Sequence, residues 1–405
     1  MLPHDLGKSV ARVAALLLLF GLSLETTARL EDWVRYRTPV LSRYRSQADL
    51  IVRDESGTHG RPNARFQKWT INNLGLRGPD LALTKGAESY RIATIGASET
   101  FGLYESPHHE FPRQLEDSLN RMVRSRDLCE SAIHRVEVLN ASMPGMSLPT
   151  SIQDLSQRLR HYGLDVVIYY PSPAQYLSDK VPRAVPPDSS GHGDEPPWSW
   201  ALYPRVAARL RDQIKLLAPN RIETWLRQRE VAAAVRAHSP GWRFERIPLD
   251  RLSAFDRDLR RFVGVVHALG ATPVLVTHAN AFARGRPPDF DLLHSWEKFY
   301  PRATGATILA FDSAAAEVTR SGAVDSGAVL VDWRALVGNS PEGIFADYGH
   351  FTDRGAGLLA GAIAKALRQA VRPRGAPCGR YAGAAPVPST NGTSRSTTTE
   401  HQEPQ

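Results

Sequence analysis

The stretch RIATIGASETFG, residues 91–102, contains the feature that decides the fold. Its first five residues form a short apolar run, which predicts a buried β-strand because strands covered on both faces are apolar throughout rather than alternating. Gly96 and Ala97 then lead to Ser98, where a loop opens towards a helical pattern. A strand that leads into a helix is the repeating unit of an α/β sheet.

The same alternation of strand and helix continues along the chain. Further strands are predicted over residues 136–139, 166–170, 273–277 and 329–332. Helices are predicted over residues 111–122, 152–161, 252–269, 292–317 and 352–370, the last with Leu358, Leu359, Ile363 and Leu367 on one face. The pattern predicts an α/β protein with a parallel sheet of about five strands, covered by helices on both sides.

Changes in composition divide the chain into parts. Residues 1–28 predict a signal or membrane anchor, and the polar, arginine-rich residues 29–88 an N-terminal extension. Residues 89–372 form the predicted α/β domain, with a proline-rich insertion at about 178–250 that is expected to form a helical cap. Residues 373–405 are rich in Pro, Gly, Ala, Ser and Thr, a composition that predicts a disordered tail.

The first residues have the layout of an export segment. Lys8 and Arg12 precede an uninterrupted apolar run over residues 13–24, which Glu25 ends. The alternative is a buried amphipathic helix, but this run has no polar face, which such a helix needs. The sequence therefore predicts an uncleaved anchor or signal, with the rest of the protein outside the cytoplasm.

Composition and charge exclude several classes of protein. The chain has 405 residues, with 50 basic and 42 acidic side chains and a net charge of +8, but its basic residues are spread along the whole length. The sequence contains no stripe of basic residues interleaved with aromatic ones, which is the pattern that indicates nucleic-acid binding. The two cysteines, Cys129 and Cys378, are too few for a disulfide scaffold or a four-cysteine zinc site. There is no phosphate-binding glycine loop or dinucleotide fingerprint, so no cofactor is expected.

Residues with catalytic chemistry follow three of the predicted strands. Ser98 follows the first strand, Gly145 lies in the loop after the second, and Asp347 and His350 lie just before the last helix. A serine hydroxyl needs a base to become a nucleophile, and a histidine oriented by a carboxylate is such a base. Each residue alone also has an ordinary explanation, as a cap, a turn or a surface histidine. Thr352 is expected to cap the last helix.

Taken together, these motifs resemble those of the SGNH/GDSL hydrolase family. The resemblance rests on G-A-S at 96–98, N-A-S-M-P-G at 140–145 and D-Y-G-H-F-T at 347–352, and covers roughly residues 89–177 and 252–370. The segment N-N-L-G-L-R-G at 72–78 is similar to what precedes the nucleophile in anchored bacterial members.

The resemblance implies a fold, an activity and a role for each matched residue. It implies a three-layer flavodoxin-like fold and hydrolysis of esters of lipids, acylated sugars or other small acyl groups. Ser98 would be the nucleophile, and Asp347 and His350 would complete the triad. The backbone N–H groups of Ser98 and Gly145 would form the oxyanion hole.

The chain departs from this family in two motifs. Ala97 stands where the family usually has aspartate, a position that is not itself catalytic. After the third strand, Pro171 stands where the family has an asparagine that donates to the oxyanion, and losing one such donor costs about 10²–10³ in turnover. Gln175 or Ser172 is a candidate substitute.

Other polar and aromatic residues are weaker candidates. His278 follows the fourth strand, where it would line the substrate pocket or serve as a structural histidine. His108, His109 and Glu110 are adjacent, but neighbouring histidines rarely share an ion without further ligands, so no metal is assigned. The insertion contains His192 and Asp194, taken as loop residues, and Trp198 and Trp200, which would form a sugar platform or pack the cap.

The sequence thus predicts a serine esterase that acts on an acylated glycan or lipid outside the cytoplasm. Two alternatives stay open. One is an O-acyltransferase, in which a polysaccharide hydroxyl replaces water and the cap excludes solvent. The other is a non-catalytic binding or assembly protein that keeps the fold, which the change at Pro171 favours.

Overall fold

The computed structural model describes residues 3–42, 44, 46–125, 133–179, 205–206, 209–210, 220–282 and 286–370. The predicted tail and about half of the predicted insertion lie outside this part of the chain. So do several residues singled out in the sequence, namely Cys129, His192, Asp194, Trp198, Trp200 and Cys378.

A five-stranded parallel sheet forms the centre of the molecule, as the sequence predicts. Its strands are β5 (Ser89–Ile95), β6 (Arg135–Asn140), β7 (Val166–Tyr169), β8 (Thr272–Val276) and β9 (Val329–Val331). They lie in the order β6-β5-β7-β8-β9, and every neighbouring pair is parallel. This is the flavodoxin-like order, in which the first strand lies between the second and the third.

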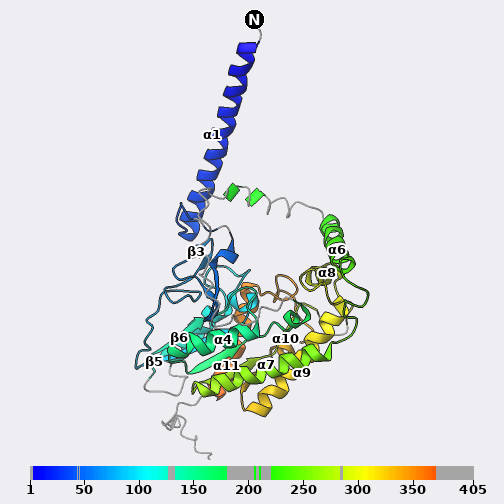
Figure 1. Ribbon diagram of the computed structural model, residues 1–405. Coiled ribbons are helices and arrows are strands. Elements are labelled where there is room, and N and C mark those ends of the chain that lie inside the picture. The colour runs from blue at the N-terminus through cyan, green and yellow to red at the C-terminus, as the bar shows by residue number, and fades with distance from the viewer. Residues whose placement is uncertain are drawn as a thin grey trace, which may run out of the picture.

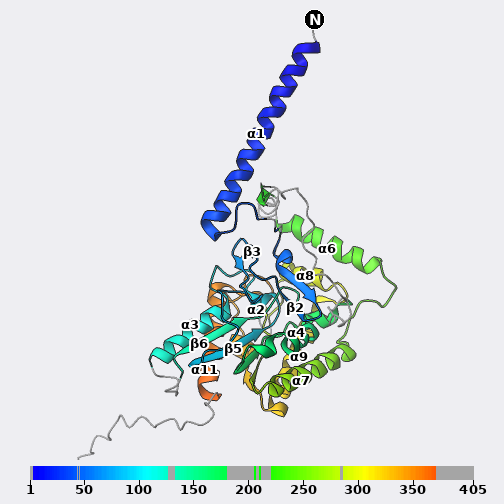
Figure 2. The ribbon, with the colours of Figure 1, turned by 60° about the vertical axis from the view of Figure 1, so that its left-hand side comes forward.

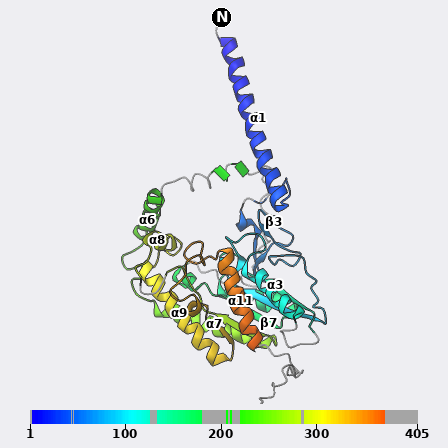
Figure 3. The same cartoon turned by 180° about the vertical axis from the view of Figure 1, so that it is seen from behind.

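Helices cover both faces of the sheet and complete a three-layer α/β fold. On one face, α3 (Phe111–Arg124) lies beside α11 (Asp353–Ala370), and Figure 3 shows the two together. On the other face lie α4 (Leu148–Gln157), α7 (Leu249–Ala268) and α9 (Gly305–Ser326), with α7 alongside α9 in Figure 2. The two helical layers follow from the right-handed crossovers that parallel strands require.

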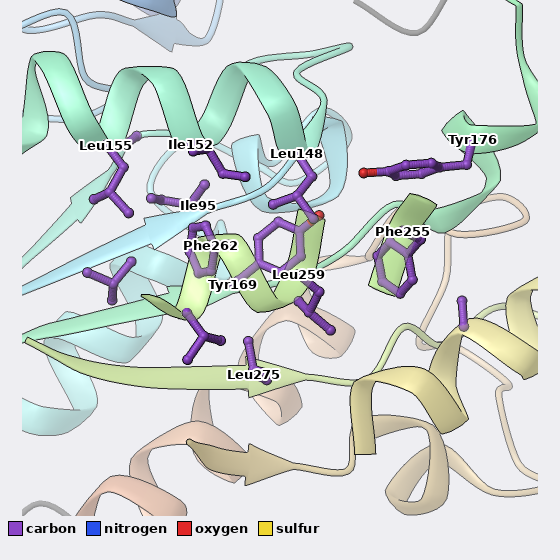
Figure 4. Close-up of a cluster of buried hydrophobic side chains, with 14 of the residues drawn as sticks. Ile95, Leu148, Ile152, Leu155, Tyr169, Tyr176, Phe255, Leu259, Phe262 and Leu275 are labelled. Carbon is purple, nitrogen blue, oxygen red and sulfur yellow. The ribbon is translucent and has the colours of Figure 1, made fainter. Parts of the chain in front are cut away.

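Alternate strand residues supply the two hydrophobic cores. Figure 4 shows one core, in which Ile95 and Tyr169 of the sheet meet Ile152 of α4 and Phe262 of α7. The intervening strand residues, among them Ile92, pack against α3 and α11 on the opposite face. Full burial of one such side chain contributes about 1.5–3 kcal/mol, so these runs fix which way each strand faces.

Two helices differ from their predicted bounds for local reasons. The helix predicted at 152–161 begins earlier, at Leu148, because Ser147 caps it through the N–H of Thr150, and it is followed by a short helix η2 (Leu159–His161). The helix predicted at 292–317 is two helices, α8 (Phe290–Phe299) and α9. Pro301 lies between them, and a proline disfavours helical backbone in the residue before it.

The final helix also requires one correction. Leu359, Ile363 and Leu367 are buried at four-residue spacing, as predicted, but Leu358 is 46% exposed. Neighbouring helical residues point about 100° apart, so Leu358 and Leu359 do not share the buried face.

The N-terminal extension forms a small separate layer of structure. It contains η1 (Gln47–Leu50) and two hairpins, β1 (Ile51–Asp54) with β2 (Gly57–Gly60) and β3 (Arg65–Phe66) with β4 (Trp69–Thr70). Its buried side chains pack against three residues that follow strands of the main sheet, namely Phe101, Met143 and Met146. The extension therefore supports the loops at the carboxyl ends of β5 and β6.

A long helix, α1 (Pro3–Tyr36), projects from the rest of the molecule in Figure 1. Its large apolar residues between Val10 and Leu24 are exposed, by 62% and 40% at the two ends, so the helix is not a buried amphipathic one. In the described part of the chain it is the one helix whose length and composition suit a membrane span or an export signal.

Three shorter helices and one further helix complete the described structure. They are α2 (Ser98–Phe101), η3 (Pro173–Leu177), α10 (Trp333–Val337) and α6 (Asn220–Arg236). The last belongs to the predicted insertion and packs beside α8 (Figure 1), where Glu230 pairs with Lys298 at 2.8 Å.

Candidate active site

Ser98 is the first residue of α2, and two residues, Gly96 and Ala97, separate it from the end of β5. The turn requires glycine at position 96, because a Cβ there would lie 2.2 Å from Thr100 Oγ1 and 2.7 Å from the carbonyl oxygen of Tyr170. The N–H groups of a helix's first turn have no partner within the helix. The turn therefore presents both the hydroxyl and the N–H of Ser98 at the carboxyl edge of the sheet.

Asp347 and His350 lie on one tight turn before α11. Asp347 Oδ1 accepts the backbone N–H groups of Gly349 and His350, each at 2.9 Å, which closes the turn. Thr352 Oγ1 donates to the carbonyl of Gly343 and accepts the N–H of Gly355 at 3.1 Å. Thr352 thus caps α11 as predicted and anchors the turn from its far side.

The structure brings the three predicted triad residues together. His350 Nδ1 lies 2.8 Å from Asp347 Oδ2, and His350 Nε2 lies 2.8 Å from Ser98 Oγ. The serine and the histidine are 252 positions apart in the chain. Both imidazole nitrogens are therefore engaged, one by a carboxylate and one by a hydroxyl, which is the geometry of a nucleophile with an oriented base.

Charges around His350 favour its protonated form. Burial lowers the pKa of His350, but the hydrogen bond to Asp347 and the nearby charges of Glu99 and Glu105 raise it more, so the net pKa lies above its usual value. Burial likewise raises the pKa of Asp347, yet hydrogen bonds from His350 and the Gly349 backbone bring the net pKa below the usual value. Asp347 stays ionised and stabilises an imidazolium at position 350.

Gly145 and Gln175 lie in adjacent loops. Gly145 has φ +75°, a backbone conformation that favours glycine, and no acceptor for its N–H is recorded in the described part of the chain. Gln175 Nε2 donates to the carbonyl of Met146 at 3.1 Å. The Gln175 side chain thus holds the loop that contains Gly145, and its place as an oxyanion donor stays a prediction.

Next to Pro171, where the SGNH/GDSL family has an asparagine, a serine is hydrogen-bonded to a carboxylate. Ser172, which follows Pro171, donates its hydroxyl to Glu99 Oε1 at 3.0 Å, and Glu99 Oε2 lies 3.4 Å from Ser98 Oγ. Glu99 is only 5% exposed. Sequence reasoning missed Glu99, although an acid directly after the candidate nucleophile was a visible signal.

Tyr104 was also missed. Its ring meets the His350 ring edge-on, with centroids 5.0 Å apart. Burial, the charge of Asp347 and a hydrogen bond to Asp347 raise the pKa of Tyr104. Tyr104 therefore adds a second contact to the carboxylate that orients His350.

His278 lies beneath the turn that contains Asp347 and His350. It is 2% exposed, and its Nδ1 lies 2.5 Å from Asp312 Oδ1. Asp312 also accepts from Asn280 and pairs with Arg334. A Cβ on Gly349 would lie 3.8 Å from His278 Nε2, so this histidine packs directly behind the turn. The geometry favours the structural alternative over a substrate contact.

The adjacent residues His108, His109 and Glu110 turn to separate partners. Glu110 pairs with Arg77 in the interior at 3.3 Å, and His109 Nδ1 lies 3.0 Å from the carbonyl of Pro107. His108 has φ +66°, on the loop before α3. Among the described residues, no group of three or more His, Cys, Asp or Glu side chains is placed to hold a metal ion.

The fold and the site together define a class of protein. It is a doubly wound α/β protein with a serine, a histidine and an aspartate aligned at the topological switch point, where β5 lies between β6 and β7. The strand order is flavodoxin-like, and residues of the three motifs on which the resemblance to the SGNH/GDSL hydrolases rests lie at the carboxyl edge of this sheet.

Comparisons with known proteins return solved structures of lipases and esterases at low sequence identity. A lipase/acylhydrolase from Enterococcus faecalis is 15% identical, with a TM-score of 0.39, over 71% of this chain and 100% of its own. Axe2, an acetylxylan esterase from Geobacillus stearothermophilus, is 12% identical, with a TM-score of 0.39, over 70% of this chain and 96% of its own. A putative lipolytic protein of the G-D-S-L family from Desulfitobacterium hafniense DCB-2 is 13% identical, with a TM-score of 0.36, over 68% of this chain and 99% of its own.

Sequence comparisons return no match. No protein-family model matches the chain, and no curated protein matches it. At the identities and TM-scores of the structural matches, the likeness says nothing of activity.

Proposed function

We propose that this protein is a serine esterase that works through an acyl-enzyme on Ser98. The observation that supports this most is the continuous hydrogen-bonded line from Asp347 through His350 to Ser98, with 2.8 Å at both junctions. Such a line provides a nucleophile, a base within reach of its proton, and a carboxylate that fixes the tautomer of the base.

The proposed reaction has two half-reactions. His350 Nε2 takes the proton of Ser98 as Oγ attacks the ester carbonyl, and the same proton then passes to the leaving alcohol as the acyl-enzyme forms. In the second half-reaction, His350 takes a proton from water, which attacks the acyl-enzyme, and returns it to Ser98 as the acid leaves. His350 is the base in each attack and the acid in each departure.

Two backbone N–H groups are proposed to stabilise the tetrahedral intermediates. Ser98 supplies one from the start of α2, and Gly145 supplies the other from the loop after β6. Because Pro171 replaces the third donor, we expect turnover about 10²–10³ slower than a site with all three donors.

The proposed substrate is an acylated glycan or lipid outside the cytoplasm. The exposed apolar surface of α1 supports a membrane-attached protein, because burying such a surface in lipid is its natural stabilisation. In this arrangement the α/β domain works on the outer side of the membrane that α1 enters.

Covalent labelling tests the esterase proposal directly. A fluorophosphonate probe is expected to label the wild-type protein and the control Ser321→Ala, which changes an exposed hydroxyl on α9. Ser98→Ala should abolish labelling without changing the thermal unfolding curve. Equal labelling of Ser98→Ala and wild type would place the reactive group elsewhere.

A non-catalytic binding protein is the second candidate. It is favoured by Pro171, which lacks the side chain of an oxyanion donor, and by the carboxylate of Glu99 beside the nucleophile. A folded wild-type protein that binds an acylated glycan but resists the probe would support this candidate and contradict the esterase.

A further inference from the structure

Glu99 places a carboxylate against the hydroxyl of Ser98. Its Oε2 lies 3.4 Å from Ser98 Oγ, and its Oε1 accepts the hydroxyl of Ser172. Among the residues that the structure describes, no lysine, arginine or histidine forms an ion pair with Glu99. A carboxylate has about four acceptor positions, so these contacts leave part of its capacity unused.

This carboxylate restricts what binds at Ser98. Because Ser98 Oγ and Glu99 Oε2 are only 3.4 Å apart, a group bonded to Ser98 Oγ lies next to Glu99 wherever it extends to that side. The developing oxyanion is negative and is repelled by Glu99, so it must point towards the N–H groups of Ser98 and Gly145. The part of the substrate that faces Glu99 must therefore be a hydrogen-bond donor.

An apolar ester does not satisfy this requirement. It would leave the unused acceptor positions of Glu99, which is only 5% exposed, without a hydrogen-bond donor and without access to water, which is costly for a charged group. A second carboxylate beside the ester would be repelled. A hydroxyl group next to the esterified oxygen, as sugars provide, donates to Glu99 and forms a charge-assisted hydrogen bond.

We propose that Glu99 is the specificity-determining residue of the site, and that it selects acylated polyols of the sugar class over lipid esters. It does so by accepting a hydrogen bond from a free hydroxyl beside the ester. This rests on the proposed esterase function and narrows its substrate from glycan or lipid to glycan.

Three substrates and one charge-removing variant test the proposal. The substrates are a mono-O-acetylated methyl glucoside, the same ester with its free hydroxyls methylated, and p-nitrophenyl acetate. Wild type should prefer the hydroxylated glucoside to its methyl ether by at least about tenfold in kcat/KM. In Glu99→Gln that preference should fall to about twofold or less, and p-nitrophenyl acetate, which carries no free hydroxyl, measures any general change in the reactivity of Ser98.

Controls separate specificity from folding. Glu317→Gln removes an exposed glutamate on α9 and should behave as wild type with all three substrates. Glu99→Asp keeps the charge but withdraws it from Ser98, so it should also weaken the preference for free hydroxyls; it replaces Glu99→Gln if that variant does not fold. The proposal would be overturned if the kcat/KM of Glu99→Gln fell by the same factor on all three substrates, or if it changed on none of them.

Failure of the esterase function is distinguishable from failure of this proposal. If wild type is folded yet neither labels with the fluorophosphonate nor hydrolyses any of the esters, the esterase proposal fails. Binding of the two glucosides, measured by ligand-observed NMR on wild type and Glu99→Gln, then decides the role of Glu99. A preference for free hydroxyls that disappears in Glu99→Gln supports it, and an unchanged or absent preference contradicts it.

Discussion

At the scale of single residues, the proposed reactivity of Ser98 comes from its neighbours. His350 is fixed by Asp347 on one nitrogen, lies against Tyr104, and reaches Ser98 with the other nitrogen. The types and spacing of Asp347 and His350 were visible in the sequence. The contact of Glu99 with Ser98 was not, because adjacent residues on a turn need not point the same way.

Asp347→Asn tests the orientation of the base. The amide cannot carry the negative charge that stabilises the imidazolium, and it favours the wrong tautomer of His350. We expect kcat to fall by about 10³–10⁴ on p-nitrophenyl acetate, with KM changing much less. Steady-state kinetics with a thermal unfolding control measure this, and a loss below about tenfold would remove Asp347 from the triad.

The pH profile tests the charges around His350. The base must be neutral to accept a proton, so activity should rise as pH increases through the pKa of His350. Because that pKa is raised by Asp347, Glu99 and Glu105, the midpoint of kcat/KM should lie above the ordinary histidine value of about 6.5. In Glu99→Gln the midpoint should move to lower pH, and a midpoint that stays in place would contradict a contribution of Glu99 to the pKa of His350.

At the scale of elements, the strand–turn–helix unit around Gly96 determines where the nucleophile lies. The predicted strands agree with the structure because each is a compact apolar run. Helix ends agree less well, since they depend on single capping and breaking residues such as Ser147 and Pro301. Glycine is required at position 96 because the loop after β7 passes close to it, a contact between segments far apart in the sequence.

Gly96→Ala tests this close approach. The added methyl would overlap Thr100 Oγ1 and the Tyr170 carbonyl, so we expect about 1–3 kcal/mol less stability and loss of fluorophosphonate labelling. The matched control is Gly264→Ala in α7, where a Cβ would meet nothing within 4 Å. That variant should gain about 0.5–1 kcal/mol, as alanine suits a helix better than glycine. Urea unfolding of both variants measures the difference, and equal stabilities would show that the turn has room for a side chain.

At the scale of the whole molecule, strand order creates the site. The order β6-β5-β7 places the loops with Ser98, Gly145 and Gln175 side by side. The turn before α11 brings His350 to the same edge of the sheet. The N-terminal extension packs under these loops through Phe101, although its polar sequence gave little sign of a structural role.

Removal of residues 2–24 tests the role of α1. This deletion keeps the last part of α1, where Arg29 donates to the carbonyl of Val40 and Asp32 pairs with Arg209. We expect the full chain to sediment with membranes and to need detergent for release, and the shortened chain to be recovered without detergent with its fluorophosphonate labelling intact. Recovery of the full chain without detergent, with α1 uncleaved, would contradict membrane attachment.

The sequence by itself determined the parallel α/β architecture, the candidate triad and the exposed apolar N-terminal helix. These depend on local information: apolar runs, glycine turns, and residues at short spacing such as Asp347 and His350. Only the tertiary structure decided that Ser98 meets His350, that His278 is buried beneath the turn, and that Glu99 faces the nucleophile. These contacts join residues through the packing of the sheet and its loops, and side-chain direction there is set by the surrounding fold rather than by neighbours in sequence.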